Sequence, residues 1–291
     1  MSRLLYYLVI LPVSYLPFWF LYLLSDIVFF MVYYLVGYRR KVVSEGLRKS
    51  FPEKSDAERL AIEKGFYAHI SDLLVESLKT FSISAEQSLV RMKVRNAELL
   101  DRFFEEGRSV TCVGGHNGNW ELYAVACDMQ IKHQTVGLYT RMQDPFFNEM
   151  IAKSRSRFGL MLVPTSDKKG IPVPCEIPTA TIFGIDQCPR ADQRAHWMEF
   201  LNQDTGVRFG AEKFARTHNM PVIFGNIRKL KRGHYEVTYE LVCENPNELP
   251  LGGIMEKSTQ MLEEKIKLQP ECWLWSHKRW KRSRPVDGNE G

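Results

Sequence analysis

One histidine and one carboxylate, five residues apart, are the side chains of this chain best suited to do chemistry. His116 follows two glycines at the end of the apolar run 110–113, and Glu121 comes just before a predicted helix. A histidine can serve as a general base near neutral pH, and a neighbouring carboxylate can fix its tautomer and stabilise its charged form. We therefore expect His116 to accept a proton from a substrate and Glu121 to orient it. A capped helix whose histidine bonds only to backbone groups would have the same spacing.

The elements around this pair must bring it to an open edge of a sheet. Residues 110–113 predict a buried strand, residues 122–127 a helix and residues 131–139 the next strand. A strand–helix–strand order predicts a parallel βαβ unit. Because sites in open α/β sheets lie at the carboxyl ends of strands, His116 is well placed, and the short loop 117–119 leaves room for a substrate.

Further patterns extend this unit to one α/β domain over residues 41–291. Apolar residues at helical spacing and helix-ending glycines predict helices at residues 41–81, 94–106, 144–158, 211–217 and 258–268, with a capping box beginning at Ser55. Strands are predicted at residues 160–163, 179–184, 221–227 and 234–242. The last of these has the alternation of an antiparallel edge strand, and it follows a basic hairpin turn at residues 228–233.

The N-terminal segment has the composition of a membrane anchor. Between residues 4 and 36, Asp26 is the only ionisable acid or base apart from tyrosines. Residues 16–36 reach the roughly 20 residues that span a bilayer. The apolar stretch is too long for a signal peptide, and the basic run 39–41 places the following domain in the cytoplasm by the positive-inside rule. We expect residues 1–40 to be a membrane anchor, and a buried helical hairpin of a soluble protein is the alternative.

Charge and cysteine patterns narrow the partners and the compartment. The net charge is +5, and basic residues cluster at residues 39–41, 228–232 and 278–282. Such clusters suit anionic lipid, phosphate or nucleic acid, and the neighbouring membrane segment argues against nucleic acid. The tail also carries Trp273, Trp275 and Trp280, which suit a membrane–water interface.

Several kinds of site lose support from missing motifs. None of the six cysteines forms a C-x-x-C pair, which indicates a reducing compartment without disulfides. The chain has no H-E-x-x-H zinc motif, no G-x-S-x-G elbow and no Walker loop. Nothing in the sequence therefore requires a metal or a cofactor.

Several blocks of the chain resemble a known family. Residues 114–121, Gly-Gly-His-Asn-Gly-Asn-Trp-Glu, are similar to the signature of the late acyltransferases of lipid A biosynthesis, whose wider group carries an H-x4-D/E motif. Other segments resemble that family in order and spacing: 139–145, 154–159, 183–187, 220–224 and 270–285. The chain departs from it at Gly115, where members often carry asparagine. It lacks the E-G-T-R block of the glycerol-phosphate branch, which favours the lipid A branch.

The resemblance implies both a fold and a reaction. The fold is a glycerolipid-acyltransferase-like mixed sheet flanked by helices, behind an N-terminal membrane helix. The reaction is direct transfer of a fatty acyl chain from an acyl carrier protein thioester to a hydroxyl of a lipid A precursor, on the cytoplasmic side of the inner membrane and without a cofactor. His116 would be the general base and Glu121 its orienting acid. The residues implied to bind substrate or to stabilise the oxyanion are Asn119, Arg155, Arg157, Asp186 and Arg208.

Alternatives stay open at this point. The acceptor could instead be a lysophospholipid, an aminolipid or another glycolipid. Arg155 and Arg157 could form structural salt bridges, and Asp186 could simply end a strand in a turn. A membrane scaffold with a degenerate acyltransferase fold predicts an incomplete histidine–carboxylate pair, and the pair is present.

Overall fold

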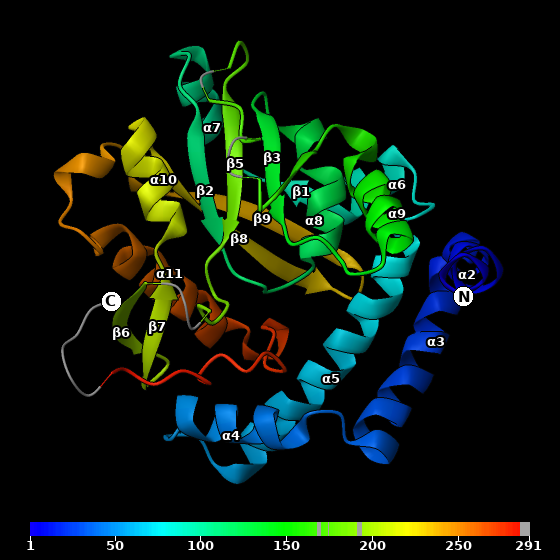
Figure 1. The fold of residues 1–291 in the computed structure, drawn as a ribbon. Helices are drawn as coiled ribbons and strands as arrows, with labels where there is room; N and C mark the ends of the chain where they lie inside the picture. Colours follow the sequence, from blue (N-terminus) through cyan, green and yellow to red (C-terminus); the bar gives the residue numbers. More distant parts are fainter. Residues whose placement is uncertain (168–169, 174, 191–193, 286–291) are drawn as a thin grey trace.

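A seven-stranded mixed sheet forms the centre of the protein. The computed structural model describes residues 1–167, 170–173, 175–190 and 194–285 (Figure 1). The strands lie in the order β1-β9-β8-β2-β5-β3-β4, and all neighbouring pairs are parallel except the antiparallel pair β8–β9. Their bounds are β1 (Met92–Val94), β2 (Val110–Gly114), β3 (Gln134–Tyr139), β4 (Met161–Pro164), β5 (Thr179–Gly184), β8 (Val222–Lys231) and β9 (His234–Cys243). The expected α/β class with a mixed sheet is confirmed.

The predicted βαβ unit is present, with another strand inserted into it. Helix α8 (Trp120–Ala126) connects β2 to β3. Both strands pair with β5 in parallel, so they are parallel to each other without being neighbours. The insertion places the carboxyl ends of β2 and β5 side by side, with Gly114 opposite Gly184.

Helices cover both faces of this sheet. They are α4 (Arg40–Ser50), α5 (Asp56–Lys79), α6 (Ala85–Arg91), α7 (Glu98–Glu105), α8, α9 (Pro145–Arg155), α10 (Gly210–His218) and α11 (Gly253–Leu268). One core cluster joins α7 and α8 to the sheet around Cys112, and the other joins α5, α10 and α11 to the sheet around Val113. The predicted capping box begins α5: Ser55 accepts the Glu58 N–H, and the Glu58 carboxylate accepts the Ser55 N–H.

Two predictions about the strands are wrong. β9 is not an edge strand, because Met92 of β1 lies opposite Tyr235 on its outer side. A three-residue strand is too short for alternation to reveal it. The basic segment 228–231 is not a turn but the end of β8, where Arg228 pairs with Glu236 of β9 across the hairpin at 3.0 Å.

A second, two-stranded antiparallel sheet lies outside the sequence predictions. It consists of β6 (Ala195–Phe200) and β7 (Gln203–Arg208). The hairpin turns at Leu201 and Asn202, both at positive φ, as a tight two-residue turn requires. The mostly polar sequence of β7 shows no strand pattern, which is why the sequence did not predict this strand. Arg208 is its last residue.

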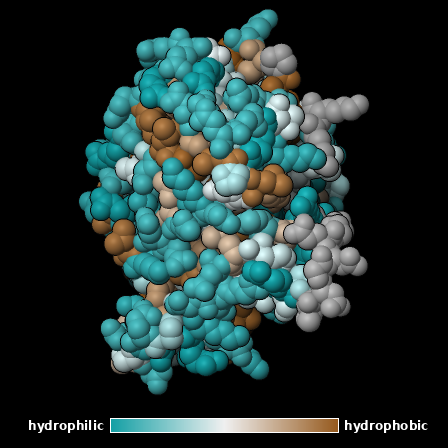
Figure 2. All heavy atoms as spheres, turned by 90° about the vertical axis from the view of Figure 1, so that its left-hand side faces the viewer, coloured by the Kyte–Doolittle hydropathy of each residue, from teal (hydrophilic) through white to brown (hydrophobic). Residues whose placement is uncertain are grey.

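The N-terminal helices lie against α5 (Figure 1). A first arm comprises α1 (Ser2–Leu5), η1 (Tyr6–Ile10) and α2 (Leu11–Tyr15), and a second comprises α3 (Phe18–Phe30) and η2 (Met31–Val36). By length and composition Phe18–Val36 is sufficient to cross a membrane, and 17% of this stretch is buried in the protein. Its outer side exposes large apolar residues, among them Trp19, Leu23, Ile27 and Phe30. The left-hand face of the molecule in Figure 1 is instead mainly hydrophilic (Figure 2).

Candidate active site

The loop between β2 and α8 carries His116 at the carboxyl end of a central strand. The two glycines before it are required by close contacts. A Cβ atom on Gly114 would lie 2.8 Å from the carbonyl oxygen of Gly225, and one on Gly115 would lie 2.6 Å from Cδ1 of Leu262 on α11. Glycine at position 115 therefore fits the close approach of α11, although it departs from the family's frequent asparagine.

Asp186 is the hydrogen-bond partner of His116. It lies two residues beyond Gly184 at the end of β5, and His116 lies two residues beyond Gly114 at the end of β2. Nδ1 of His116 lies 2.6 Å from Oδ1 of Asp186, and the His116 backbone N–H donates to Oδ2 at 2.7 Å. The register of two parallel strands thus builds this pair.

The surroundings of Asp186 determine the tautomer of His116. Its Oδ2 atom also accepts the indole N–H of Trp273 at 2.9 Å. Burial alone would raise the pKa of Asp186, but the charge and hydrogen bonds of His116, together with Trp273, hold that pKa well below its usual 3.8. His116 therefore donates through Nδ1 to a carboxylate, and Nε2 keeps its lone pair, 3.4 Å from the side-chain nitrogen of Gln187.

The pKa of His116 suits a base. Burial acts to lower this pKa, but the charge and the hydrogen bond of Asp186, with the charge of Glu121, outweigh burial and raise it above 6.5. The side chain of His116 is 22% exposed, so a substrate can reach it. A base whose pKa lies near the working pH accepts a proton efficiently and later releases it.

Glu121 contacts Arg155 rather than His116. It lies in the first turn of α8, and its two oxygens accept Nε–H and Nη2–H of Arg155 at 2.9 and 2.6 Å. This is a bidentate pair, the strongest geometry between these groups. The H-x4-E spacing predicted that Glu121 orients His116, but Asp186 makes that hydrogen bond instead. Glu121 influences His116 through its charge and fixes the position of Arg155.

Arg157 and Asn119 have their polar groups engaged in neighbouring structure. Asn119 is fully buried; it caps α8 by accepting the Leu122 N–H at 2.8 Å and donates to Glu76 at 2.6 Å. Arg157 donates to the carbonyl groups that follow α5, those of Thr80, Phe81 and Ile83. The structure brings Asn119 into the wall of the site and places Arg157 at the end of α5.

The C-terminal segment closes over the loop. The N–H of Gly118 donates to the carbonyl of Cys272 at 3.0 Å, and the N–H of Leu274 donates to the carbonyl of His116 at 3.1 Å. Together with the indole of Trp273 on Asp186, these bonds fix both members of the pair from the far end of the chain.

The tryptophans of this segment belong to the core. Trp273 and Trp275 are each 2% exposed. Trp273 packs on Phe200, and Trp275 packs on Phe51. Placing these two at a membrane–water interface is therefore a wrong prediction, because burying their large apolar rings inside the domain is the more favourable use of them.

Two arginines complete the surroundings of the pair. Arg208 ends β7 and donates one N–H to the carbonyl of Cys188 at 3.3 Å. Arg279 comes from the C-terminal segment and is 2% exposed. The charge of Asp186 acts on the pKa of both. The family resemblance implied a role for Arg208 but not for Arg279, whose only signal in the sequence is its place in a basic tail.

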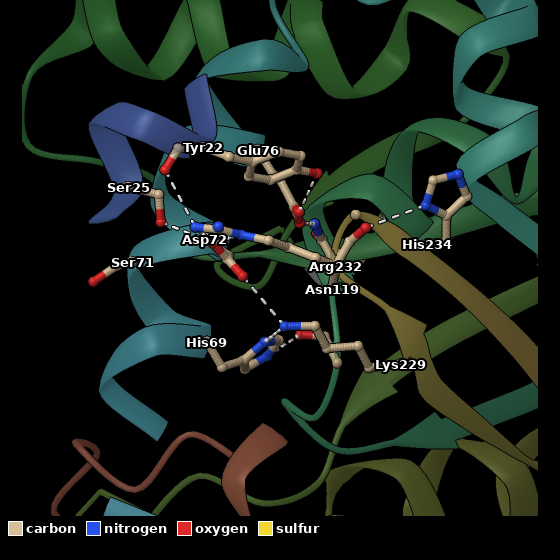
Figure 3. Close-up of polar contacts among 12 residues, drawn as sticks. Tyr22, Ser25, His69, Ser71, Asp72, Glu76, Asn119, Lys229, Arg232 and His234 are labelled. Carbon is tan, nitrogen blue, oxygen red and sulfur yellow. Dashed lines mark hydrogen bonds and ion pairs between the residues drawn. The ribbon is translucent and has the colours of Figure 1, made fainter. Parts of the chain in front are cut away.

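A second polar cluster holds the loop from the side of α5 (Figure 3). His69 donates from Nε2 to the carbonyl of Gly118 at 3.1 Å and so packs against the loop. Burial and the charge of Lys229 lower the pKa of His69 to about 4, so the ring is neutral. Glu76 accepts hydrogen bonds of 2.6 to 3.0 Å from Asn119, Tyr235 and Tyr22.

The same cluster reaches the middle of α3. Asp72 accepts from Ser25 of α3 at 2.8 Å, from Arg232 at 2.8 Å and from Lys229 at 3.3 Å. Arg232 also pairs with Asp26 of α3 at 2.6 Å. Every charged side chain in this cluster therefore has a partner. The series of polar contacts runs from α3 through α5 to the loop of His116.

The site contains groups that can accept a proton and stabilise the resulting charge. Over the part of the chain that the structure describes, no three histidine, cysteine or acidic side chains lie close enough to hold a metal ion. All six cysteines are free, as predicted. The site thus offers an oriented imidazole, a buried carboxylate and nearby guanidinium donors.

One comparison identifies relatives of the chain. A family model described as bacterial lipid A biosynthesis acyltransferase matches residues 2–282. No curated protein matches the chain. The matched range contains the N-terminal helices, the two strands that carry His116 and Asp186, and most of the C-terminal segment.

Proposed function

The protein belongs to the bacterial lipid A biosynthesis acyltransferase family, and we propose that it moves a fatty acyl chain from an acyl carrier protein thioester to a hydroxyl of a lipid A precursor. The observation that carries this proposal is the pair His116–Asp186 at the ends of adjacent strands, in which Nδ1 of His116 lies 2.6 Å from Asp186 and the His116 side chain is 22% exposed. That arrangement is what activation of a hydroxyl group needs.

The proposed reaction is a single acyl transfer. His116 Nε2 takes the proton of the acceptor hydroxyl, and the oxygen of that hydroxyl attacks the carbonyl carbon of the thioester. The new C–O bond forms, the C–S bond breaks, and the proton passes from His116 to the departing thiolate. Asp186 stabilises the imidazolium that exists in between. This route requires no covalent acyl-enzyme.

Arg155 is the proposed donor to the tetrahedral oxyanion. Glu121 engages its Nε and Nη2 groups, which leaves further N–H donors of the fork. A donor that is already fixed in place stabilises developing negative charge without reorganisation. In this proposal Glu121 contributes by holding Arg155 and by raising the pKa of His116, and Asp186 has the orienting role.

Residues 1–40 are the proposed anchor, and residues 41–291 the proposed catalytic domain on the cytoplasmic side of the inner membrane. The outer side of α3 supports this, because Trp19, Leu23, Ile27 and Phe30 are each more than half exposed. The basic residues 39–41 follow the apolar stretch and suit anionic lipid headgroups. The six free cysteines fit a reducing compartment.

Mass spectrometry of total lipids tests the proposal. Cells that produce the wild-type protein should gain one acyl chain on lipid A, and cells that produce His116→Ala should not. We expect a loss of about 10³–10⁴-fold in transfer rate, the upper range for removal of a general base. A gain on phospholipids instead would assign another acceptor, and wild-type product from His116→Ala would remove the proposed base.

A further inference from the structure

Two arginines beside the catalytic pair, Arg279 buried and Arg208 partly buried, have unsatisfied guanidinium nitrogens among the residues that the structure describes. Arg279 is 2% exposed. Within the described residues its side chain makes no hydrogen bond or ion pair, and its Nε atom is buried without a partner. Arg208 has the same orphaned Nε, and the hydrogen bond that its side chain makes within the described part of the chain goes to the uncharged carbonyl of Cys188.

The surrounding backbone holds these two arginines in place. The N–H of Arg279 donates to the carbonyl of His277 at 2.8 Å, and Nε2 of His277 accepts the N–H of Cys188 at 3.0 Å. Cys188 is the residue whose carbonyl receives the N–H of Arg208. The C-terminal segment, the end of β7 and the loop after β5 thus meet at one point.

Electrostatics place the two guanidinium groups near each other and near Asp186. The charge of Arg208 lowers the pKa of Arg279, and that of Asp186 raises it. Burial is the largest influence and brings the pKa of Arg279 down to about 10, so the side chain keeps its charge at neutral pH. Asp186 supplies one negative charge for the two guanidinium groups, and within the described residues its oxygens bond to His116 and Trp273 rather than to either arginine.

A buried charge is costly unless it is paired and hydrogen-bonded, and two guanidinium groups that share one carboxylate are only partly paired. A folded protein tolerates this cost where a ligand supplies the missing charge. The guanidinium fork matches the geometry of a phosphate group and can bind it through two parallel hydrogen bonds. Two such forks beside the base would hold a phosphate-bearing substrate in register with the reacting hydroxyl or thioester.

We propose that Arg208 and Arg279 form a phosphate-binding site beside His116 and Asp186. This inference rests on the proposed acyl transfer only for the origin of the phosphate. The acyl carrier protein presents its thioester on a phosphate-linked arm, and the lipid A precursor carries phosphate on its sugars. The two sources share one chemistry, and kinetics can separate them.

Binding of inorganic phosphate tests the site independently of any reaction. Arg279→Met keeps most of the side-chain volume and removes the charge. In phosphate-free buffer the variant should melt at a higher temperature than the wild-type protein, because an unpaired buried charge has been removed. Added phosphate should raise the melting temperature of the wild-type chain by mass action and leave that of the variant unchanged.

Arg284→Met is the matched control. Arg284 lies on the same C-terminal segment and already pairs with Asp204 of β7 at 2.6 Å. Its loss should leave the response to phosphate intact. An equal response to phosphate in wild type and Arg279→Met would overturn the site, and so would a lowered melting temperature combined with an unchanged response.

Arg279→Lys covers the case in which the methionine variant does not fold. Lysine keeps the charge but loses the fork, so the response to phosphate should weaken without loss of the fold. A lysine variant that responds fully would contradict bidentate recognition at this position.

Two kinetic comparisons of kcat/KM identify the source of the phosphate. The first compares an acyl carrier protein donor with an acyl-pantetheine thioester that has no phosphate. The second compares the lipid precursor before and after dephosphorylation. In the wild-type enzyme, removing the recognised phosphate should lower kcat/KM about 10–100-fold, the range for a charge-assisted hydrogen bond. Arg279→Met should abolish that dependence in one arm. Phosphate dependence unchanged by the variant in both arms would refute the role in transfer, while an inactive enzyme that still binds phosphate would refute the reaction alone.

Discussion

Two buried polar clusters touch the loop of His116, and they differ in how their charges are satisfied. In the cluster shown in Figure 3, Glu76 accepts three hydrogen bonds and Asp72 pairs with Lys229 and Arg232. In the cluster around Arg208 and Arg279, buried guanidinium nitrogens have no partner among the residues described. Arginine occurs in both clusters, but the first contains the carboxylates that pair with it.

The difference separates structure from recognition. A saturated cluster has no capacity left for a ligand, and its value lies in fixing α3, α5 and the loop relative to one another. An unsaturated cluster lowers the stability of the protein without ligand, because its buried donors are unpaired, and binding of a ligand can restore that stability. Removing a member should therefore have opposite effects on stability in the two places.

Breaking the saturated cluster should have the largest effect on the fold. Glu76→Ala leaves the buried donors of Asn119 and Tyr235 unpaired, and we expect a loss of about 3 kcal/mol in the free energy of unfolding. Denaturant unfolding followed by tryptophan fluorescence measures it. Glu76→Gln is the control, since an amide oxygen still accepts and the loss should be smaller. A loss below about 0.5 kcal/mol for the alanine variant would show that this cluster does not hold the loop.

The pH dependence of transfer distinguishes the two carboxylates near His116. The base must be neutral to act, so kcat/KM falls as pH drops through the raised pKa of His116. Asp186→Asn lowers that pKa, which moves the acidic limb to lower pH, and the loss of imidazolium stabilisation should cut kcat about 10²-fold. Glu121→Gln should shift the limb less, because Glu121 acts only through its charge. A larger shift with Glu121→Gln would return the orienting role to the H-x4-E pair.

Substitutions on the outer side of α3 should have the smallest effect on the free energy of unfolding. The inner side of α3 joins the saturated cluster through Ser25 and Asp26, whereas Trp19, Leu23 and Phe30 face outward. Changing these three to serine should leave unfolding within about 0.5 kcal/mol of wild type and release the chain from membranes. Membrane flotation measures it. The matched control replaces the exposed residues Leu60, Leu251 and Leu268 by serine; release by the control alone would place the membrane-binding surface elsewhere.

Much of the fold follows from local pattern. Short apolar runs bounded by glycine or proline predicted β2, β4, β5 and β8, and the S-x-x-E pattern at Ser55 predicted the start of α5. What local pattern does not contain is strand order. β5 comes after β3 and β4 in the chain but lies between β2 and β3, and only that order brings Asp186 to His116.

Contacts between distant parts of the sequence could not be predicted either. The substrate roles of Asn119 and Arg157 came from the family-like blocks 114–121 and 154–159 and stay predictions. The blocks do not contain the partners of these side chains, because Asn119 bonds to Glu76 and Arg157 bonds to the carbonyl of Thr80. Arg279 looked like one basic residue among several in a tail. The burial of Arg279 depends on how the C-terminal segment packs over β7, and the neighbouring residues in the sequence do not predict that packing.

The closure of the C-terminal segment over the loop of His116 also couples the base to folding. Cys272, Trp273 and Leu274 make hydrogen bonds with Gly118, Asp186 and His116, residues far away in the sequence. Contacts between such distant residues form slowly in folding, because a long loop must close first. We therefore expect that a chain with its central sheet formed still lacks an oriented histidine until this segment has packed.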